Sequence, residues 1–265
     1  MEQVAVPITA GWSLDAVVAR LSAHEAVTGL LQIGSLAEGA LTAASDYDLV
    51  IVLREAPQPW YVGVTQIGGR FADLIFVAAA EAARVGALTE PIGSDHQLAP
   101  VARWLNHGRI IFDRSGQLQQ AQQHLRRGNW LRPTDDAAAY GAWFAINYNL
   151  AQARRMVRAA DSLYRTTVQI RMAVYGSADL WFGYFTMRQL PFEGDKTAVS
   201  YLLRHDRTFL QLYRQFIAET DVDQKLVRYA EAAAQATAPL GGLWPADATV
   251  MNVPETLEAW QRLLA

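Results

Sequence analysis

Two carboxylates stand at the start of a run that otherwise has the character of a buried β-strand. Asp46 and Asp48 precede the apolar residues 49–53. Residues two apart on a strand point to the same face, about 6.7 Å apart along the backbone. Two like charges at this spacing repel each other, and a cation between them offsets the repulsion. Because Mg²⁺ prefers oxygen ligands and is typically held by one or two carboxylates plus substrate phosphates, the pair predicts a magnesium site.

A Gly-Ser pair precedes these carboxylates, with ten residues in between. Gly34 and Ser35 follow an expected strand, residues 29–33, and come before an expected short helix, residues 36–41. Glycine lets the backbone approach a phosphate closely, and exposed amides at the start of a helix bind anions. The Ser35 hydroxyl adds a further donor. A phosphate-binding turn beside a metal-binding pair is typical of a nucleoside triphosphate site.

A third carboxylate belongs to another expected strand. Asp73 is the one acidic residue in the apolar run 71–77. An ionised carboxylate buried alone is costly, so we expect Asp73 to be paired or to bind a metal. If its strand lies beside residues 46–53, three carboxylates converge at one edge of the sheet.

Each of these residues also has a purely structural interpretation. Asp46 could be a cap or turn residue after Ser45, and Asp73 could form an ion pair at a strand edge. Gly34 and Ser35 could form an ordinary strand-to-helix turn. A calcium-binding loop is excluded, because residues 50–53 are apolar where ligands should stand.

The elements that must position these residues predict an α+β chain of two domains. Residues 1–117 combine a small mixed β-sheet with flanking helices, and residues 118–265 are expected to form an all-α helical bundle. In the first domain, a helix begins at a Ser13 or Asp15 cap. The Gly68-Gly69 turn between residues 60–67 and 71–77 predicts a β-hairpin. The other expected elements of this domain are helices at 78–88 and 101–107 and a strand at 108–116. The helices expected in the second domain are 118–127, 137–159, 162–175, 179–188, 196–220, 223–236 and 255–264.

Composition limits the classes of function. The chain has 265 residues and no cysteine, which excludes disulfides, thiol catalysis and a cysteine zinc site. The sequence shows no signal peptide and no apolar run of about eighteen residues, so we expect a soluble cytoplasmic protein without a membrane span. The net charge is −3, and the negative charge is concentrated in residues 1–118. Without a basic block the chain is not suited to binding long nucleic acid, whereas its acidic half could attract cations.

The combined motif resembles the signature of the nucleotidyltransferase superfamily, which includes antibiotic nucleotidyltransferases and polymerase-β-like enzymes. The resemblance covers residues 29–78 and consists of Gly34-Ser35, Asp46-Tyr47-Asp48 and the later strand aspartate. It implies that Gly34 and Ser35 hold the triphosphate and that Asp46 and Asp48 bind Mg²⁺. Asp73 would be a third ligand or the general base. The corresponding residue is commonly glutamate in these enzymes, and the shorter reach of aspartate favours metal binding.

The helical half is most similar in length and kind to that of streptomycin/spectinomycin-type aminoglycoside adenylyltransferases. This resemblance implies AMP transfer from ATP to a hydroxyl of a small molecule such as an aminoglycoside-type antibiotic, but it does not define whether the protein confers antibiotic resistance. In that group a basic residue of the helical half contacts the phosphates, and Lys196, at an expected helix start, is the candidate here; it could equally be a surface lysine. Glu193, Asp195 and the pair Asp135-Asp136 are expected to be helix-start acids, with contact to the acceptor as the alternative.

Three functions follow from these residues. The first is Mg²⁺-dependent transfer of a nucleoside monophosphate, from ATP or another triphosphate, to a small-molecule hydroxyl. The second is the same transfer to a protein or RNA acceptor, as in toxin–antitoxin modules. The third is nucleotide binding without turnover. No histidine has an arginine at the spacing of the ribonuclease partners of small nucleotidyltransferases. The sequence does not define the acceptor, the preferred nucleotide or the oligomeric state.

Overall fold

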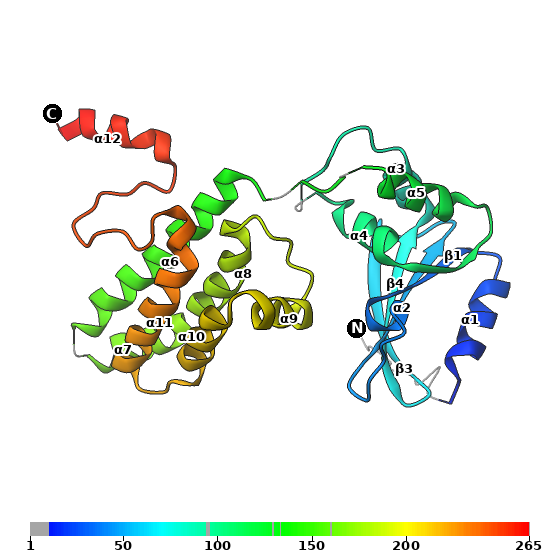
Figure 1. Cartoon of the computed structure of the whole chain (residues 1–265), viewed down its shortest axis with the longest axis horizontal. Coiled ribbons are helices and arrows are strands. Elements are labelled where there is room, and N and C mark those ends of the chain that lie inside the picture. Colours follow the sequence, from blue (N-terminus) through cyan, green and yellow to red (C-terminus); the bar gives the residue numbers. More distant parts are fainter. Residues whose placement is uncertain (1–10, 94–95, 129, 133, 160, 265) are drawn as a thin grey trace. The chain divides into compact units, whose positions relative to one another are not determined.

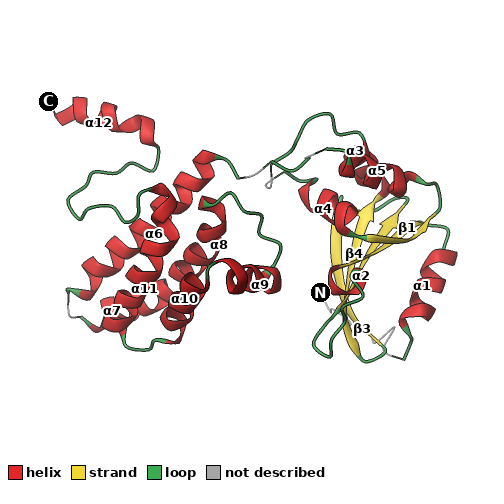
Figure 2. Cartoon of the chain, in the orientation of Figure 1, coloured by secondary structure: helices red, strands yellow, loops and turns green. Residues whose placement is uncertain are grey.

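The chain consists of two compact units, Met1–Arg132 and Pro133–Ala265 (Figure 1). The computed structural model describes residues 11–93, 96–128, 130–132, 134–159 and 161–264. The class is α+β, as predicted, with a mixed sheet in the first unit and helices in the second (Figure 2). The division falls after residue 132 rather than after residue 117, because α5 (Gln117–Arg126) packs against helices of the first unit. Among the described residues, no helix combines the length and the apolar character needed to cross a membrane.

The first unit is built on a five-stranded sheet in the order β3-β4-β2-β1-β5. Only β2 and β4 are parallel to each other; the other neighbouring strands are antiparallel. The sheet is therefore mixed, as the sequence predicted. The strands are β1 (Val27–Ile33), β2 (Tyr47–Leu53), β3 (Trp60–Ile67), β4 (Arg70–Ala78) and β5 (Arg109–Asp113).

Helices cover both faces of this sheet. One face packs against α3 (Ala79–Gly86), α4 (Ala99–His107) and α5, and the other packs against α1 (Leu14–Ala23). Along β2, Val50 and Val52 enter the first of these cores and Leu49 and Ile51 enter the second. Burial on both faces explains the continuous apolar run in β2. The Ser13 side chain accepts a hydrogen bond from the Ala16 amide and caps α1, as predicted.

The predicted hairpin is confirmed. Strands β3 and β4 pair in antiparallel register, from Trp60 opposite Val77 to Ile67 opposite Arg70. Gly68 and Gly69 form the turn with φ angles of 59° and 78°. Two consecutive positive φ angles match the twist of the flanking strands and favour glycine.

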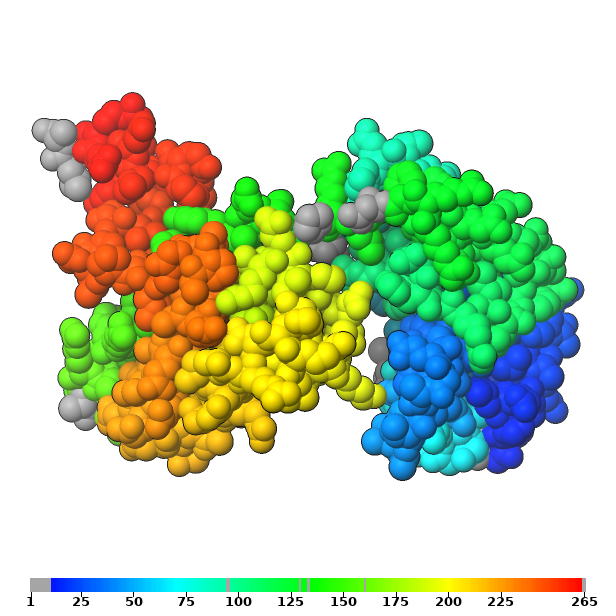
Figure 3. Space-filling model, in the orientation of Figure 1, coloured from blue at the N-terminus to red at the C-terminus, as the bar shows by residue number. Residues whose placement is uncertain are grey.

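The second unit is helical and has one apolar core, to which Leu180, Phe209 and Tyr229 contribute. Figures 1 and 3 show α12 on the outside of the other helices of this unit. The helices are α6 (Asp136–Val157), α7 (Ser162–Arg171), a π-helical turn (Met172–Gly176), α8 (Ser177–Met187), α9 (Asp195–His205), α10 (Arg207–Ala218), α11 (Val222–Thr237), 3₁₀ turns at Ala238–Leu240 and Pro254–Thr256, and α12 (Leu257–Leu264).

Two helix predictions were wrong. The single helix expected over residues 196–220 is interrupted at Asp206, which has φ −151° and ψ 72° and whose side chain accepts a hydrogen bond from the Phe209 amide. This cap begins α10, so the apolar periodicity continues across a break in the backbone. The helix expected over residues 36–41 is instead the four-residue α2 (Gly34–Ala37), which starts at the glycine itself.

Candidate active site

Three aspartates converge on one face of the first unit. Parallel pairing of β2 with β4 places Asp48 directly opposite Asp73, and Asp46 precedes the first residue of β2. One carboxylate oxygen from each of the three lies within 4.8 Å of the other two. All three residues are half-buried. The predicted convergence is confirmed, and we call Asp46, Asp48 and Asp73 the triad.

The apolar pattern of the strands sets this register. Val50 lies opposite Ile75 and Val52 lies opposite Val77, so both strands contribute side chains to the same core. A slip of one residue would turn these side chains to the other face, because side chains alternate along a strand. The register that buries the valines is therefore the one that brings Asp48 to Asp73.

The triad fits a divalent cation. Three ionised carboxylates this close repel each other, and a shared cation converts the repulsion into attraction. Ligand oxygens lie about 2.0–2.1 Å from Mg²⁺ in an octahedron, so neighbouring ligand oxygens are about 2.9 Å apart and opposite ones about 4.1 Å apart. The oxygens of the triad, all within 4.8 Å of one another, are close enough together to be candidate ligands of one ion.

The Gly34 turn lies against the triad. Ile33 is paired with Asp48 across the β1–β2 ladder, and the turn follows directly. Gly34 has a φ of 58°, and a Cβ atom at this position would lie 2.9 Å from Asp48 Oδ2. The left-handed backbone therefore favours glycine here, and a larger residue would shift the Asp48 carboxylate. Ser35 follows and is half-buried, so the residues predicted to bind phosphate are next to the residues predicted to bind metal.

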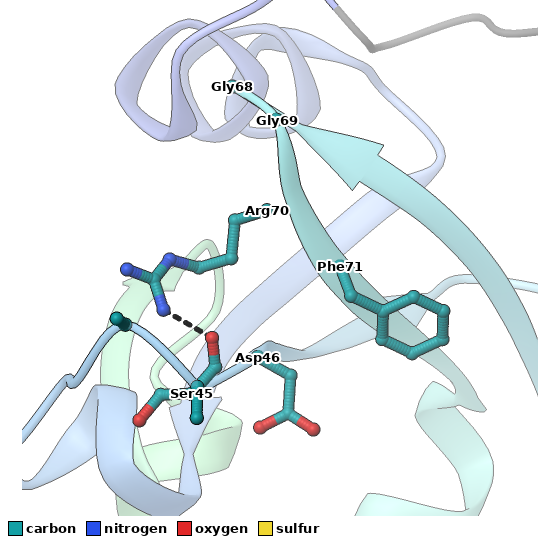
Figure 4. A pocket seen from close by; sticks show the side chains of 8 residues that line it. Ser45, Asp46, Gly68, Gly69, Arg70 and Phe71 are labelled. Carbon is teal, nitrogen blue, oxygen red and sulfur yellow. Dashed lines mark hydrogen bonds between the residues drawn. The ribbon is translucent and has the colours of Figure 1, made fainter.

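Arg70 holds the loop that leads into the triad, and sequence reasoning missed it. Its Nη1 donates hydrogen bonds to the Thr42 carbonyl, at 2.7 Å, and to the Ser45 carbonyl (Figure 4). Its guanidinium lies 5.2 Å from the centre of the Tyr47 ring. Residues 43–46 and 68–71 together line a depression of about 460 Å³. An arginine directly after the Gly68-Gly69 turn was the available signal, but its partners lie more than twenty residues earlier in the chain.

A second arginine is held at the β1–β5 side of the sheet. Arg109 Nε donates to Gln32 Oε1 at 3.0 Å, and Nη2 donates to the same oxygen. Gln32 is only 6% exposed and is neutral, so it orients the guanidinium without cancelling its charge. His107, Arg109 and Arg126 line a depression of about 470 Å³ that also includes Ala37, at the end of α2, and one acid, Glu38. Sequence reasoning missed this basic depression too.

The candidates in the second unit have mostly structural surroundings. Asp135 caps α6 by accepting from the Ala138 amide at 2.8 Å, and Asp195 accepts from Trp181 Nε1 at 3.0 Å in the first turn of α9. Both are helix-start acids, as expected. Lys196 is exposed in the same turn, and its predicted contact with a triphosphate stays a prediction.

No protein-family model and no curated protein matches the chain. Among solved structures it is similar to a nucleotidyltransferase-like protein from Exiguobacterium sibiricum 255-15, with 14% identity over 86% of this chain and 77% of that chain. The TM-score is 0.37. A likeness of this size does not indicate a function.

Proposed function

We propose that this protein is a Mg²⁺-dependent nucleotidyltransferase that transfers a nucleoside monophosphate, AMP from ATP, to a hydroxyl of a small molecule. The observation that supports it is the triad, with its three carboxylate oxygens within 4.8 Å of one another. The Gly34 turn, in contact with Asp48, adds a place where a phosphate can approach the backbone.

The triad residues would have two roles, binding the metal ion and accepting a proton. Asp46 and Asp48 would hold Mg²⁺, which when bound would supply positive charge for the α-phosphate and the leaving pyrophosphate. A carboxylate oxygen of Asp73 lies within 4.8 Å of one from each of the other two, which supports a role as third ligand. A carboxylate of the triad accepts the proton of the attacking hydroxyl.

The remaining site residues would position the triphosphate. Gly34 and Ser35 offer backbone and hydroxyl donors beside the triad, and Arg70 holds the preceding loop in place. Lys196 is the predicted phosphate contact from the second unit. An aminoglycoside-type acceptor, antibiotic resistance and a cytoplasmic location are predictions that rest on the resemblance or on composition.

Isothermal titration tests this proposal. ATP, GTP, CTP and UTP are each titrated with and without Mg²⁺ into the wild type and into Asp46→Asn/Asp48→Asn. Asp15→Asn, which removes an exposed charge from α1 in the same unit, is the matched control. We expect Mg²⁺-dependent binding of ATP to the wild type and the control, and none to the double variant.

The result also separates the alternatives. Binding that persists in the double variant would show that the triad is not the metal site. Mg²⁺-dependent binding without pyrophosphate release, across small-molecule, protein and RNA acceptors, would favour a nucleotide-binding module without turnover. Release only with a protein or RNA acceptor would favour the toxin–antitoxin-like alternative.

A further inference from the structure

The triad belongs to a row of residues that runs across four strands. Val64 on β3 is paired with Asp73, Asp73 with Asp48, and Asp48 with Ile33 on β1. Paired residues point to the same face of a sheet, with Cβ atoms about 4.5–5.5 Å apart in antiparallel pairs. The side chain next to the Asp73 carboxylate, on the side away from Gly34, is therefore that of Val64.

An exposed apolar strip surrounds Val64. Val62 and Val64 are 51% and 65% exposed, and Phe71, two residues before Asp73 on the same face of β4, is 51% exposed. Toward the start of β3 this face is covered at Trp60, whose ring lies edge to face against the Trp104 ring of α4. The two ring centres are 5.6 Å apart. We call Val62, Val64 and Phe71 the apolar strip.

The strip lacks the charges that a polycationic acceptor would need. No residue of β3 is charged. Arg70, next to Phe71 in sequence, points to the other side of β4, where it bonds the Ser45 carbonyl (Figure 4) and the Thr42 carbonyl. Large exposed side chains in a continuous patch beside a polar centre are typical of a ligand-binding surface.

The order of the strands indicates which side of the triad the acceptor approaches. In phosphoryl transfer the attacking and leaving oxygens are roughly in line. The Gly34 turn lies on the β1 side of the triad, which suits the leaving pyrophosphate. The attacking hydroxyl then comes from the opposite side, over Asp73 and β3.

We propose that the acceptor carries its hydroxyl on an apolar, ring-containing framework rather than on the polycationic framework of an aminoglycoside, and that the apolar strip binds this framework beside Asp73. This inference rests on the proposed nucleotidyl transfer. The acceptor oxygen forms a bond to the α-phosphorus while the bond from that phosphorus to the bridging oxygen of the β-phosphate breaks. The hydroxyl proton passes to a carboxylate of the triad, and pyrophosphate leaves toward Gly34. Apolar area at the strip, rather than charge, then selects the acceptor.

Ligand-detected NMR tests the strip with two small probes, 2-phenylethanol and the diamino cyclitol 2-deoxystreptamine. Saturation transfer reports binding, and line broadening by Mn²⁺, added with a non-hydrolysable ATP analogue, reports closeness to the triad. We expect both signals for 2-phenylethanol and neither for 2-deoxystreptamine. Val64→Thr keeps the β-branched shape and should weaken 2-phenylethanol binding about three- to tenfold. Val64→Glu should abolish it.

Val227→Glu is the matched control, because Val227 is an exposed valine on α11, outside the strip. Circular dichroism checks that each variant folds, and Val64→Thr keeps the test valid if Val64→Glu does not fold. Equal binding of 2-phenylethanol to the wild type and Val64→Thr would overturn the proposal, as would broadening of 2-deoxystreptamine alone.

The failure of this inference can be told apart from the failure of the proposed function. Binding of Mn²⁺ and the ATP analogue, measured by titration, tests the nucleotide site alone. If these bind but 2-phenylethanol does not depend on Val64, the nucleotide site stands and the acceptor class is wrong. If saturation transfer depends on Val64 but no nucleotide binds, the strip binds apolar rings and the proposed transfer is wrong.

Discussion

Three carboxylates lie close together in the first unit, whereas in the second unit a single carboxylate accepts hydrogen bonds from three donors. The triad brings Asp46, Asp48 and Asp73 within 4.8 Å of one another. In the second unit, Asp206 accepts hydrogen bonds from the Phe209 amide at 2.9 Å, the Tyr184 hydroxyl at 2.9 Å and the Gln235 amide at 3.2 Å.

The pKa of Asp206 reflects these three hydrogen bonds. Burial by itself would raise the pKa, but the three hydrogen bonds and the nearby Arg188 guanidinium outweigh it and hold the pKa below its usual range. The ionised form of Asp206 is thus stabilised by groups of its own unit. A single carboxylate that accepts hydrogen bonds from its own unit stabilises the fold, whereas a cluster of carboxylates is a candidate cation site. The comparison therefore separates a structural acid from a candidate binding site.

The largest expected effect comes from removing charge from the triad. Asp46→Asn/Asp48→Asn should lower pyrophosphate release about 10³-fold, because metal stabilisation of the transition state is worth several kcal/mol. The thermal midpoint should stay the same or rise, since like charges are removed. Steady-state kinetics and calorimetry measure the two quantities. A large drop in stability with little loss of activity would put the triad in the same structural class as Asp206.

The next effect concerns the approach of Gly34 to Asp48. Gly34→Ala places a methyl group 2.9 Å from Asp48 Oδ2, so the carboxylate must shift away from its position in the triad. We expect transfer activity to fall about 10²-fold, in the range found when one positioned catalytic group is lost.

Gly39→Ala is the control for this variant. Gly39 also has a positive φ, 68°, but a Cβ there meets nothing within 4 Å. Both variants should lose about 1–2 kcal/mol of stability from the left-handed backbone. Equal activity in the two variants would show that the contact with Asp48 is not needed.

Asp206→Ala should reduce stability rather than activity. Loss of the cap and of the two side-chain hydrogen bonds should destabilise the second unit by about 1–2 kcal/mol, after allowance for partial solvent exposure. Asp221→Ala removes a cap with a single hydrogen bond, from the Gln224 amide, and should cost about 1 kcal/mol. Urea unfolding compares the two, and a smaller loss for Asp206→Ala would contradict the assignment.

The lowered pKa of Asp206 also predicts that the stability of the protein depends on pH. Because the pKa of folded Asp206 lies below its unfolded value, its contribution to stability is fully present above the unfolded pKa, about 3.9, and is lost as the pH falls through the folded pKa. The difference in unfolding free energy between wild type and Asp206→Asn should therefore shrink below about pH 4. Unfolding followed between neutral and strongly acidic pH measures it.

The smallest expected effect is at Arg70. Arg70→Gln removes the charged donor that bonds the Thr42 and Ser45 carbonyls, so the loop before Asp46 loosens while the triad itself is unchanged. We expect kcat/KM to fall about tenfold, the equivalent of one charge-assisted hydrogen bond. Arg54→Gln is the control, because Arg54 also bonds a main-chain carbonyl, that of Glu25, outside the site. Equal effects would show that the loop does not matter.

Local signals predicted much of the fold. The Gly68-Gly69 turn and the alternation on either side of it are short-range features, and the hairpin they predict is present. The break at Asp206 was missed because apolar periodicity runs through it; aspartate as the cap of a new helix was the unused signal. The boundary near residue 117 was placed too early, since the packing of α5 against α3 and α4 is not a local property.

Some residues of the candidate site could likewise be predicted from the sequence, and others could not. The sequence singled out four candidates, Asp46, Asp48, Asp73 and Gly34, because their residue types and spacing are those that metal and phosphate binding need. Arg70 was missed because its partners are set by the folded loop. The apolar strip was not predicted either, because an alternating strand does not reveal which of its faces stays uncovered.

The sequence by itself determined which groups could bind a cation and a phosphate, because a strand places residues two apart on one face whatever it pairs with. The position of Asp73 was decided only by tertiary structure. Its distance from Asp48 depends on parallel pairing of β2 with β4, which are 25 residues apart in register. That pairing follows from burying Val50, Val52, Ile75 and Val77 under the helices, a long-range requirement that no local pattern contains.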